Sequence, residues 1–199
     1  MMKLLVATGN PGKLRELKQL LAILDFDVMG LDQLDKPPVV EEDGATFTDN
    51  ARKKALTLAR FSGCLTLADD SGLCVDVLDG APGVFSARYA GEQGDDKANN
   101  AKLIKALRET PLKQRKAHFH CCIALAWPDE RCKIVEGQVD GLIINQERGT
   151  HGFGYDPLFL VPEYGKTMAE LPAEIKNRIS HRGRALQRIL PLLQEIVEQ

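Results

Sequence analysis

The chain contains 199 residues with a mass of 22.0 kDa, a size that suits one domain. Hydrophobic residues make up 44% and charged residues 27%, which excludes a disordered chain. The formal charge of -2 excludes a protein that coats nucleic-acid duplexes through an overall basic surface. The apolar runs are much shorter than the ~20 residues of a membrane helix, and the N-terminus lacks a signal-peptide pattern. We therefore expect a soluble, cytoplasmic protein with no membrane or direct nucleic-acid contacts.

The first part of the chain alternates strand and helix signals. Residues 3–7 form a short apolar run typical of a buried strand. A helix is predicted from Pro11, with Asn10 as its cap, because proline suits the first helical position. Its apolar stripe contains Leu14, Leu17, Leu21 and Leu24. A second strand is predicted over residues 26–29, and the polar stretch 32–44 is a predicted loop.

The next segment predicts a helix over residues 47–61 and then an interrupted strand. The helix is alanine-rich, and we expect Lys53, Lys54 and Arg60 to project outward from it. Residues 65–68 form the first part of the strand. The turn-like sequence Asp69-Asp70-Ser71-Gly72 breaks it, and the extended pattern resumes over residues 73–78.

The second half predicts one helix, a hairpin and a final helix. The first helix covers residues 95–108, since acidic residues favour a helix N-terminus. The expected strands are 118–126, 131–139, 142–145 and 158–161, the first two forming a hairpin. A last helix over 184–197 contains Pro191, which we expect to bend or divide it. Interleaved strands and helices predict an α/β fold with a mixed central sheet.

The cysteines and histidines do not favour a metal centre. Five cysteines, an odd number without paired CxxC spacing, argue against both a disulfide framework and a zinc site. Cys74, Cys121 and Cys122 lie in apolar runs, where we expect buried thiols. His118 and His120 share one face if their segment is a strand, but no third ligand stands near them in the sequence.

Three segments carry residues suited to nucleotide chemistry. The TGNPGK sequence connects a predicted strand to a predicted helix. At such a connection, backbone N–H groups and the positive end of the helix dipole can hold phosphate. The spacing of the two glycines and the lysine is not that of a P-loop. The acidic residues at 41–43 and at 69–70 supply the oxygen ligands that Mg²⁺ prefers. Residues 152–157, Lys176 and 180–183 combine aromatic and basic groups suited to a flat nucleotide base. Each segment has an ordinary structural reading as well, as a helix cap, an exposed turn and a glycine turn. Together the three suggest a Mg²⁺–nucleoside triphosphate site.

Six motifs resemble the inosine triphosphate pyrophosphatase family. They are ATGNPGK at 7–13, EEDGATFTDNARKKA at 41–55, ADDSGL at 68–73, GAPGVFSARYAG at 80–91, GFGYDP at 152–157 and SHRG at 180–183. The resemblance covers nearly the whole chain and implies one domain over residues 1–199. It implies an elongated α/β fold with a mixed central sheet, flanking helices and two lobes around a long substrate cleft, usually as a homodimer.

The resemblance also implies an activity and a set of residues for it. The activity is Mg²⁺-dependent hydrolysis of ITP, dITP and XTP to the monophosphate and pyrophosphate, which keeps these nucleotides out of DNA and RNA. Asp70 matches the catalytic carboxylate that binds metal and accepts the proton, Glu42 the second metal ligand, and Lys54 a phosphate-contacting lysine. The triphosphate loop is matched by Thr8, Gly9, Asn10, Pro11, Gly12 and Lys13. The other substrate-binding positions are Ser71 beside Asp70 and the base-recognition set Phe153, Gly154, Tyr155, Asp156, Lys176, His181 and Arg182.

Two alternatives remain at this point. One is a regulator that binds a nucleotide without cleaving it, against which the complete set of Glu42, Asp70 and lysines argues. The other is a pyrophosphatase for different modified nucleotides, such as methylated pyrimidine triphosphates.

Overall fold

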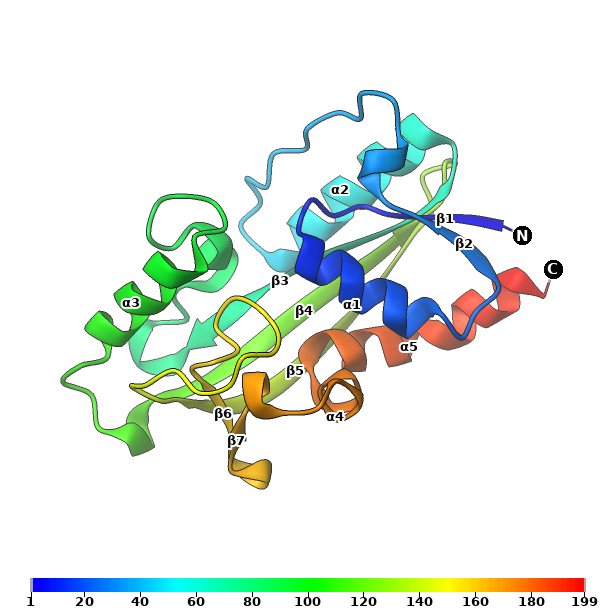
Figure 1. The fold of residues 1–199 in the computed structure, drawn as a ribbon. Coiled ribbons are helices and arrows are strands. Elements are labelled where there is room, and N and C mark those ends of the chain that lie inside the picture. The colour runs from blue at the N-terminus through cyan, green and yellow to red at the C-terminus, as the bar shows by residue number, and fades with distance from the viewer. Residues whose placement is uncertain (1, 199) are drawn as a thin grey trace. The chain divides into compact units, whose positions relative to one another are not determined.

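The computed structural model describes residues 2–198. The helices are α1 (Pro11–Leu21), α2 (Phe47–Ser62), α3 (Asp96–Ala106), α4 (Ala173–Ile179) and α5 (His181–Val197) (Figure 1). The strands are β1 (Met2–Val6), β2 (Phe26–Met29), β3 (Leu65–Val75), β4 (Lys116–Ala126), β5 (Cys132–Ile143), β6 (Phe159–Val161) and β7 (Lys166–Thr167). The chain divides into two compact units. Unit 1 contains residues 1–70, 121–137 and 182–199, and unit 2 contains residues 71–120 and 138–181. The prediction of a single domain stays a prediction.

The strands form one seven-stranded sheet in the order β2-β1-β3-β4-β5-β6-β7. β1 is parallel to both β2 and β3, with Leu4 opposite Val28 on one side and Leu65 on the other. β6 is antiparallel to both β5 and β7. The prediction of an α/β fold with a mixed sheet and flanking helices is therefore confirmed.

Unit 1 has helices on both faces of its strands (Figure 1). Because side chains alternate along a strand, Cys121 and Cys122 point to opposite faces and enter separate cores. On the Cys121 face, strand side chains such as Leu4 and Ile123 pack with leucines of α1 and α5. On the Cys122 face, the alanines of α2 pack closely against the sheet, and this side of the helix carries Ala51, Ala55, Leu58 and Ala59.

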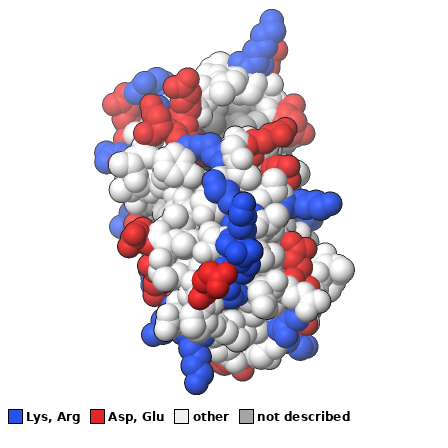
Figure 2. Space-filling view, turned by 90° about the vertical axis from the view of Figure 1, so that its left-hand side faces the viewer, with Lys and Arg blue, Asp and Glu red and all other residues white. Residues whose placement is uncertain are grey.

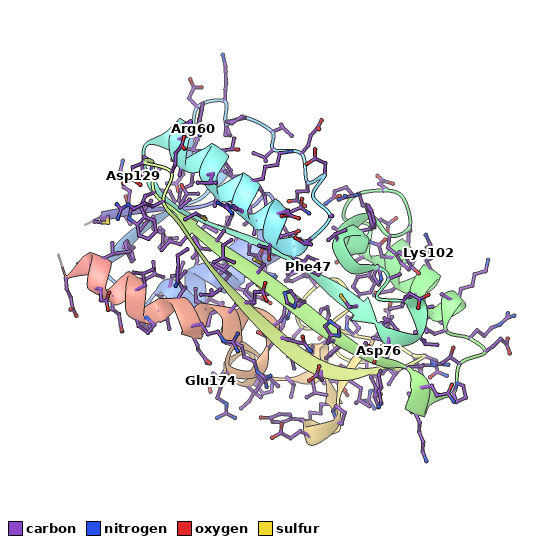
Figure 3. The ribbon with its side chains drawn as sticks, turned by 180° about the vertical axis from the view of Figure 1, so that it is seen from behind. Phe47, Arg60, Asp76, Lys102, Asp129 and Glu174 are labelled. Atoms are coloured by element: carbon purple, nitrogen blue, oxygen red, sulfur yellow. The ribbon has the colours of Figure 1, made fainter. Side chains whose placement is uncertain are left out.

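Local signals set the ends of α1 and α2. The Asn10 side chain accepts a hydrogen bond from the Lys13 backbone N–H, and Pro11 occupies the first helical position, as predicted. Thr46 caps α2 in the same way through the Asp49 N–H, and Gly63 ends it in a left-handed conformation with φ of 66°. Phe47 and Arg60 are labelled near the two ends of α2 in Figure 3.

Unit 2 has a core of its own. Its buried side chains come from the later part of β3, the first part of β4, the later part of β5, α3, and residues 155–179. Phe119 and Phe159 form an aromatic pair in this core, with ring centroids 4.5 Å apart. The hydroxyl of buried Tyr155 donates to the Ser86 carbonyl, which satisfies the polar end of an otherwise apolar side chain.

Several predicted boundaries are wrong. β3 continues through residues 69–72 instead of breaking there, because the two aspartates meet polar partners in the folded chain rather than water. The predicted strands 131–139 and 142–145 are one strand, β5, and α5 continues through Pro191 without division. α4 and β7 were not predicted, since neither is long enough to show a clear periodicity.

Acidic and basic side chains are interspersed over the face shown in Figure 2, in line with the small formal charge. All five cysteines are free thiols. Within residues 2–198, no helix combines the length and the apolar character needed to pass through a membrane.

Candidate active site

The loop between β1 and α1 positions Thr8, Asn10 and Lys13. The Asn10 backbone N–H donates to Thr8 Oγ1 at 3.1 Å, and Asn10 Oδ1 accepts the Lys13 backbone N–H at 3.1 Å. These two bonds fix the loop at the N-terminus of an eleven-residue helix, where the helix dipole favours a negative charge. Outside residues 8–10, no described protein atom lies within 4 Å of the position that a Cβ on Gly9 would occupy. The local geometry is therefore that of an open anion-binding loop.

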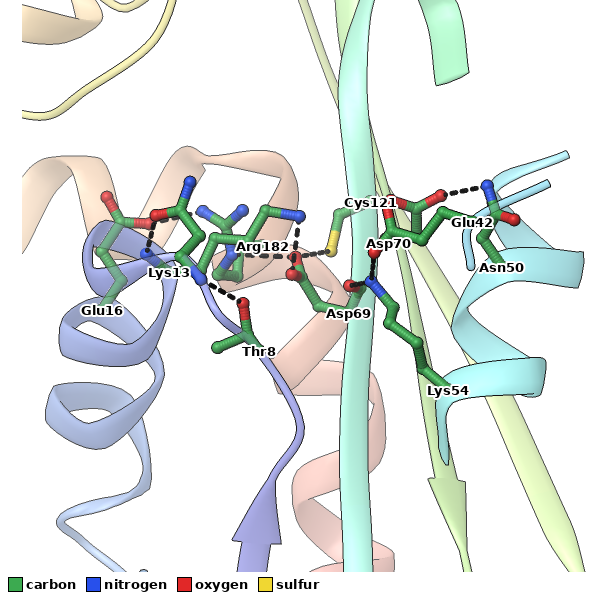
Figure 4. Close-up of polar contacts among 11 residues, drawn as sticks. Thr8, Lys13, Glu16, Glu42, Asn50, Lys54, Asp69, Asp70, Cys121 and Arg182 are labelled. Carbon is green, nitrogen blue, oxygen red and sulfur yellow. Dashed lines mark hydrogen bonds and ion pairs between the residues drawn. The ribbon is translucent and has the colours of Figure 1, made fainter. Parts of the chain in front are cut away.

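Asp69 is a buried carboxylate surrounded by cations (Figure 4). Its Oδ1 lies 2.9 Å from Lys13 Nζ, and its Oδ2 accepts a hydrogen bond from Arg182 Nε at 3.1 Å. The Asp69 backbone carbonyl accepts a bond from Lys54 Nζ at 2.9 Å. Burial alone raises the pKa of Asp69, but the charges of Lys13, Arg182 and Lys54 outweigh it and hold this pKa far below its usual range. Asp69 is therefore ionised and holds three cationic side chains in place.

Cys121 completes the surroundings of Asp69. Its thiol donates to Asp69 Oδ2, with the sulfur 3.4 Å from the oxygen. Burial and the negative charge of Asp69 raise the pKa of this thiol well above its usual value. Cys121 therefore remains a neutral hydrogen-bond donor and not a thiolate nucleophile.

Asp70 lies beside Asp69 in β3, on the side that carries Glu42 and Lys54 (Figure 4). Lys54 Nζ is 2.5 Å from Glu42 Oε1. Burial raises the pKa of Asp70, and repulsion from Glu42 adds to it, whereas Lys54, Lys13 and Asn50 lower it; the balance is a raised pKa. The reciprocal attraction of Glu42, Asp70 and Asp69 overcomes burial and raises the pKa of Lys54, which stays charged. Two carboxylates that repel each other beside a charged lysine form a site suited to a further cation.

Unit 1 also contains Arg182, which the resemblance assigns to base recognition. Its guanidinium is almost fully buried, bonded through Nε to Asp69 and through Nη1 to Glu16 Oε2 at 2.5 Å. A base-reading role for Arg182 stays a prediction. Its contacts within unit 1 give Arg182 a second role, which is to hold the Asp69 carboxylate in position.

Unit 2 contains the remaining base-recognition residues. Lys176 Nζ is 2.7 Å from Asp156 Oδ2, and the same oxygen accepts the Phe153 backbone N–H at 3.0 Å. Lys176 Nζ also lies 5.4 Å from the centre of the Phe153 ring. Gly152 has φ of +85°, and a Cβ there would approach Asp156 Oδ2 to 2.1 Å, so this turn requires glycine. Asp156 thus fixes the lysine and the aromatic ring together.

His181 is held by an aromatic platform in unit 2. Its ring stacks on Phe119, with centroids 4.8 Å apart and an angle of 15° between the planes. His181 is mostly buried, so its ring has one defined orientation. Ser71 and Tyr155 also belong to unit 2.

One expectation about the site is wrong, and several participants were not predicted. Lys53 and Arg60 are exposed, but Lys54 is 8% exposed and not directed outward, because Glu42, Asp70 and the Asp69 carbonyl offset its desolvation. Sequence reasoning missed Glu16, Asn50, Phe119 and Cys121. A signal existed for two of them. Glu16 follows Lys13 by one helical turn, and Asn50 precedes Lys54 by one turn on the face that carries the alanines.

Comparison with known proteins gives the family. The family model described as the Ham1 family matches residues 4–192. The chain belongs to the Ham1 family. Among Ham1 relatives, the "dITP/XTP pyrophosphatase" of Desulforamulus reducens is 53% identical over 98% of this chain and 97% of its own length. That of Geobacter sulfurreducens is 54% identical over 94% of each chain. The solved structure of a HAM1 protein from Coxiella burnetii matches with a TM-score of 0.88 and 41% identity, covering 98% of this chain and 100% of that one.

Proposed function

We propose that this protein hydrolyses the non-standard purine nucleoside triphosphates ITP, dITP and XTP to the monophosphate and pyrophosphate. The observation that carries the proposal is the arrangement of Glu42 and Asp70 beside Lys54, with Lys13 held by Asp69. A pure nucleotide-binding protein has no need to keep two repelling carboxylates near a phosphate loop. The relatives named dITP/XTP pyrophosphatase, similar over nearly the full chain, support the choice of substrate. Removal of these nucleotides keeps them out of DNA and RNA.

The donor set at Glu42 and Asp70 fits Mg²⁺. No group of three or more His, Cys, Asp or Glu residues suited to a metal occurs in the part of the chain that the structure describes. Mg²⁺ typically takes only one or two protein carboxylates and completes its shell with water and substrate phosphate, so two carboxylates suffice. When bound by Glu42 and Asp70, Mg²⁺ supplies neutralisation of phosphate charge and a lowered pKa for bound water.

The protein's own side chains accept the proton, stabilise the leaving group and hold these groups in position. Asp70 accepts the proton of the attacking water, and its raised pKa brings it closer to the pKa of an effective base at neutral pH. Lys13 and Lys54 provide positive charge where the departing pyrophosphate accumulates negative charge. Asp69 has no proton to exchange, and it keeps Lys13 in position.

We further infer that the protein acts as a homodimer in the cytoplasm. The basis for the dimer is the family resemblance, and sedimentation at micromolar concentration tests it by giving twice the 22.0 kDa chain mass. The substrate proposal is tested by assaying pyrophosphate and monophosphate release from a panel that includes ITP, dITP, XTP, ATP, GTP and a methylated pyrimidine triphosphate. Binding of ITP without product release would instead favour a regulator.

The bond that breaks is a testable part of this mechanism. Attack of water on the α-phosphorus releases pyrophosphate in one step, so hydrolysis in heavy-oxygen water places the label in the monophosphate. Mass spectrometry of both products measures it. Label in the pyrophosphate would show attack on the β-phosphorus and contradict the mechanism.

Base selectivity gives a second test. A purine with an oxygen at position 6 accepts hydrogen bonds from Lys176, whereas the amino group of adenine does not, and an unmatched buried donor costs about 1–3 kcal/mol. Lys176→Ala therefore lowers kcat/KM for ITP far more than for ATP. Phe153→Ala is the matched control, because an aromatic ring stacks on every base and its loss weakens both substrates alike. An equal loss for ITP and ATP in Lys176→Ala would remove Lys176 from base recognition.

A further inference from the structure

Asn50 is a buried amide in the first turn of α2 that the mechanism above does not use. It is 1% exposed, and both ends of its side chain form hydrogen bonds. Figure 4 shows the bond to Asp70. Asn50 Nδ2 donates to Asp70 Oδ2 at 3.0 Å. Asn50 Oδ1 accepts the backbone N–H of Gly44 at 2.8 Å. The residue therefore connects the reacting carboxylate to the loop that carries Glu42.

The partners of the amide determine which way it faces. The Gly44 N–H can only donate, so the end of Asn50 that faces it must be the oxygen. The other end is then the NH₂ group, and it can only donate to Asp70. This donor holds Asp70 Oδ2 in one place, so the carboxylate keeps one orientation.

The loop end of this connection depends on close packing. A Cβ at Gly44 would lie 2.7 Å from Asn50 Oδ1 and 2.7 Å from Asp49 Cβ, so a larger residue would push the loop away. Gly44 follows Glu42 by two residues, and Glu42 is itself bonded to Lys54, one turn after Asn50 on α2. A shift at Gly44 therefore reaches Glu42.

We propose that Asn50 is a positioning residue that holds the Asp70 carboxylate and the Glu42 loop in the arrangement that hydrolysis requires. The proposal rests on the proposed function for its activity readout. Its hydrogen-bond partners Asp70 and Gly44 both belong to unit 1, and neither is among the substrate-binding residues named above. Asn50 therefore affects the rate of the chemical step rather than nucleotide affinity.

The test exchanges the two groups in a double-mutant cycle of Asn50→Asp, Asp70→Asn and both together. Asn50→Asp keeps the size of the side chain and its acceptor for Gly44 but turns a carboxylate toward Asp70. We expect kcat for ITP to fall by about tenfold or more, the scale of a lost hydrogen bond to a charged group. KM changes by less than about threefold, since neither hydrogen-bond partner of Asn50 is an assigned substrate-binding residue. The melting temperature falls by about 5 °C.

The double variant separates positioning from general support of the fold. It restores a donor–acceptor pair with the two roles reversed, so the melting temperature regains at least about half of the loss. Its kcat remains within about threefold of Asp70→Asn alone, because the carboxylate now stands at the wrong position. The proposal would be overturned if the kcat losses of the two single variants multiplied in the double variant. It would also be overturned if the melting temperature of the double variant did not recover.

Asn99 provides a matched control in unit 2. It is also 1% exposed and lies in the first part of α3, where its Oδ1 accepts the Ala90 N–H at 2.7 Å and its Nδ2 donates to the Ala87 carbonyl at 3.4 Å. Asn99→Asp lowers the melting temperature but leaves kcat within about twofold of wild type, as a structural amide should. If Asn50→Asp also stays within about twofold, Asn50 is structural. If Asp70→Asn itself retains activity, the mechanism is wrong, while the melting temperatures still report the Asn50–Asp70 bond.

Discussion

Asp70→Asn lowers kcat for ITP at least about a hundredfold, the low end of the contribution of a general base. Asparagine keeps the shape of the side chain and still accepts the bond from Asn50, but it cannot take a proton and is a weaker metal ligand. The fold remains intact. Burial and Glu42 already raise the pKa of Asp70, so removal of its charge does not lower the melting temperature. Steady-state release of pyrophosphate, together with thermal unfolding, measures both effects.

Asp27→Asn controls for the general effect of losing an acidic residue. Asp27 is an exposed residue of β2 in the same unit, and its replacement leaves kcat unchanged. Near wild-type turnover in a folded Asp70→Asn protein would remove Asp70 from the mechanism.

Asp69→Asn destabilises the protein by about 3–5 kcal/mol, the cost of leaving buried charges without their partner. Asp69 is fully buried, and its charge is shared by Lys13 and by Arg182, whose guanidinium is 2% exposed. An amide of the same shape accepts one of these donors but neutralises neither charge. Urea unfolding monitored by circular dichroism measures the free energy of unfolding.

A surface ion pair shows whether burial or distance determines this effect. Asp43 lies 2.6 Å from Lys53, closer than Asp69 is to Lys13, yet the Asp43 side chain is 64% exposed. Water solvates both partners there, so Asp43→Asn leaves the urea midpoint unchanged. If Asp69→Asn also left the urea midpoint unchanged, the cations around Asp69 would be held by other contacts. The role assigned to Asp69 would then be wrong.

Local sequence signals predicted most of the secondary structure correctly. The strand over Phe26–Met29 has the predicted bounds, α2 differs from its prediction by one residue, and Asn10 caps α1 as expected. These features depend on apolar periodicity and on contacts between residues three or four positions apart. Similarly, the glycine-rich loop at 9–12 and the acidic pair at 69–70 were recognisable because their chemistry lies in adjacent residues. The resemblance of six ordered motifs led to the family that the comparisons confirm.

The tertiary structure decided where the charges lie. Asp69-Asp70-Ser71-Gly72 has the composition of an exposed turn, and the sequence therefore predicted a break in the strand. In the folded chain it is the middle of β3, because Lys13, Lys54 and Arg182 come from three other segments to compensate Asp69. The same compensation of charge buries Lys54, which the sequence analysis expected to project outward. A turn is decided by the conformational preferences of four neighbouring residues, whereas the burial of a carboxylate is decided by the cations that surround it, and these come from positions as distant as 13 and 182.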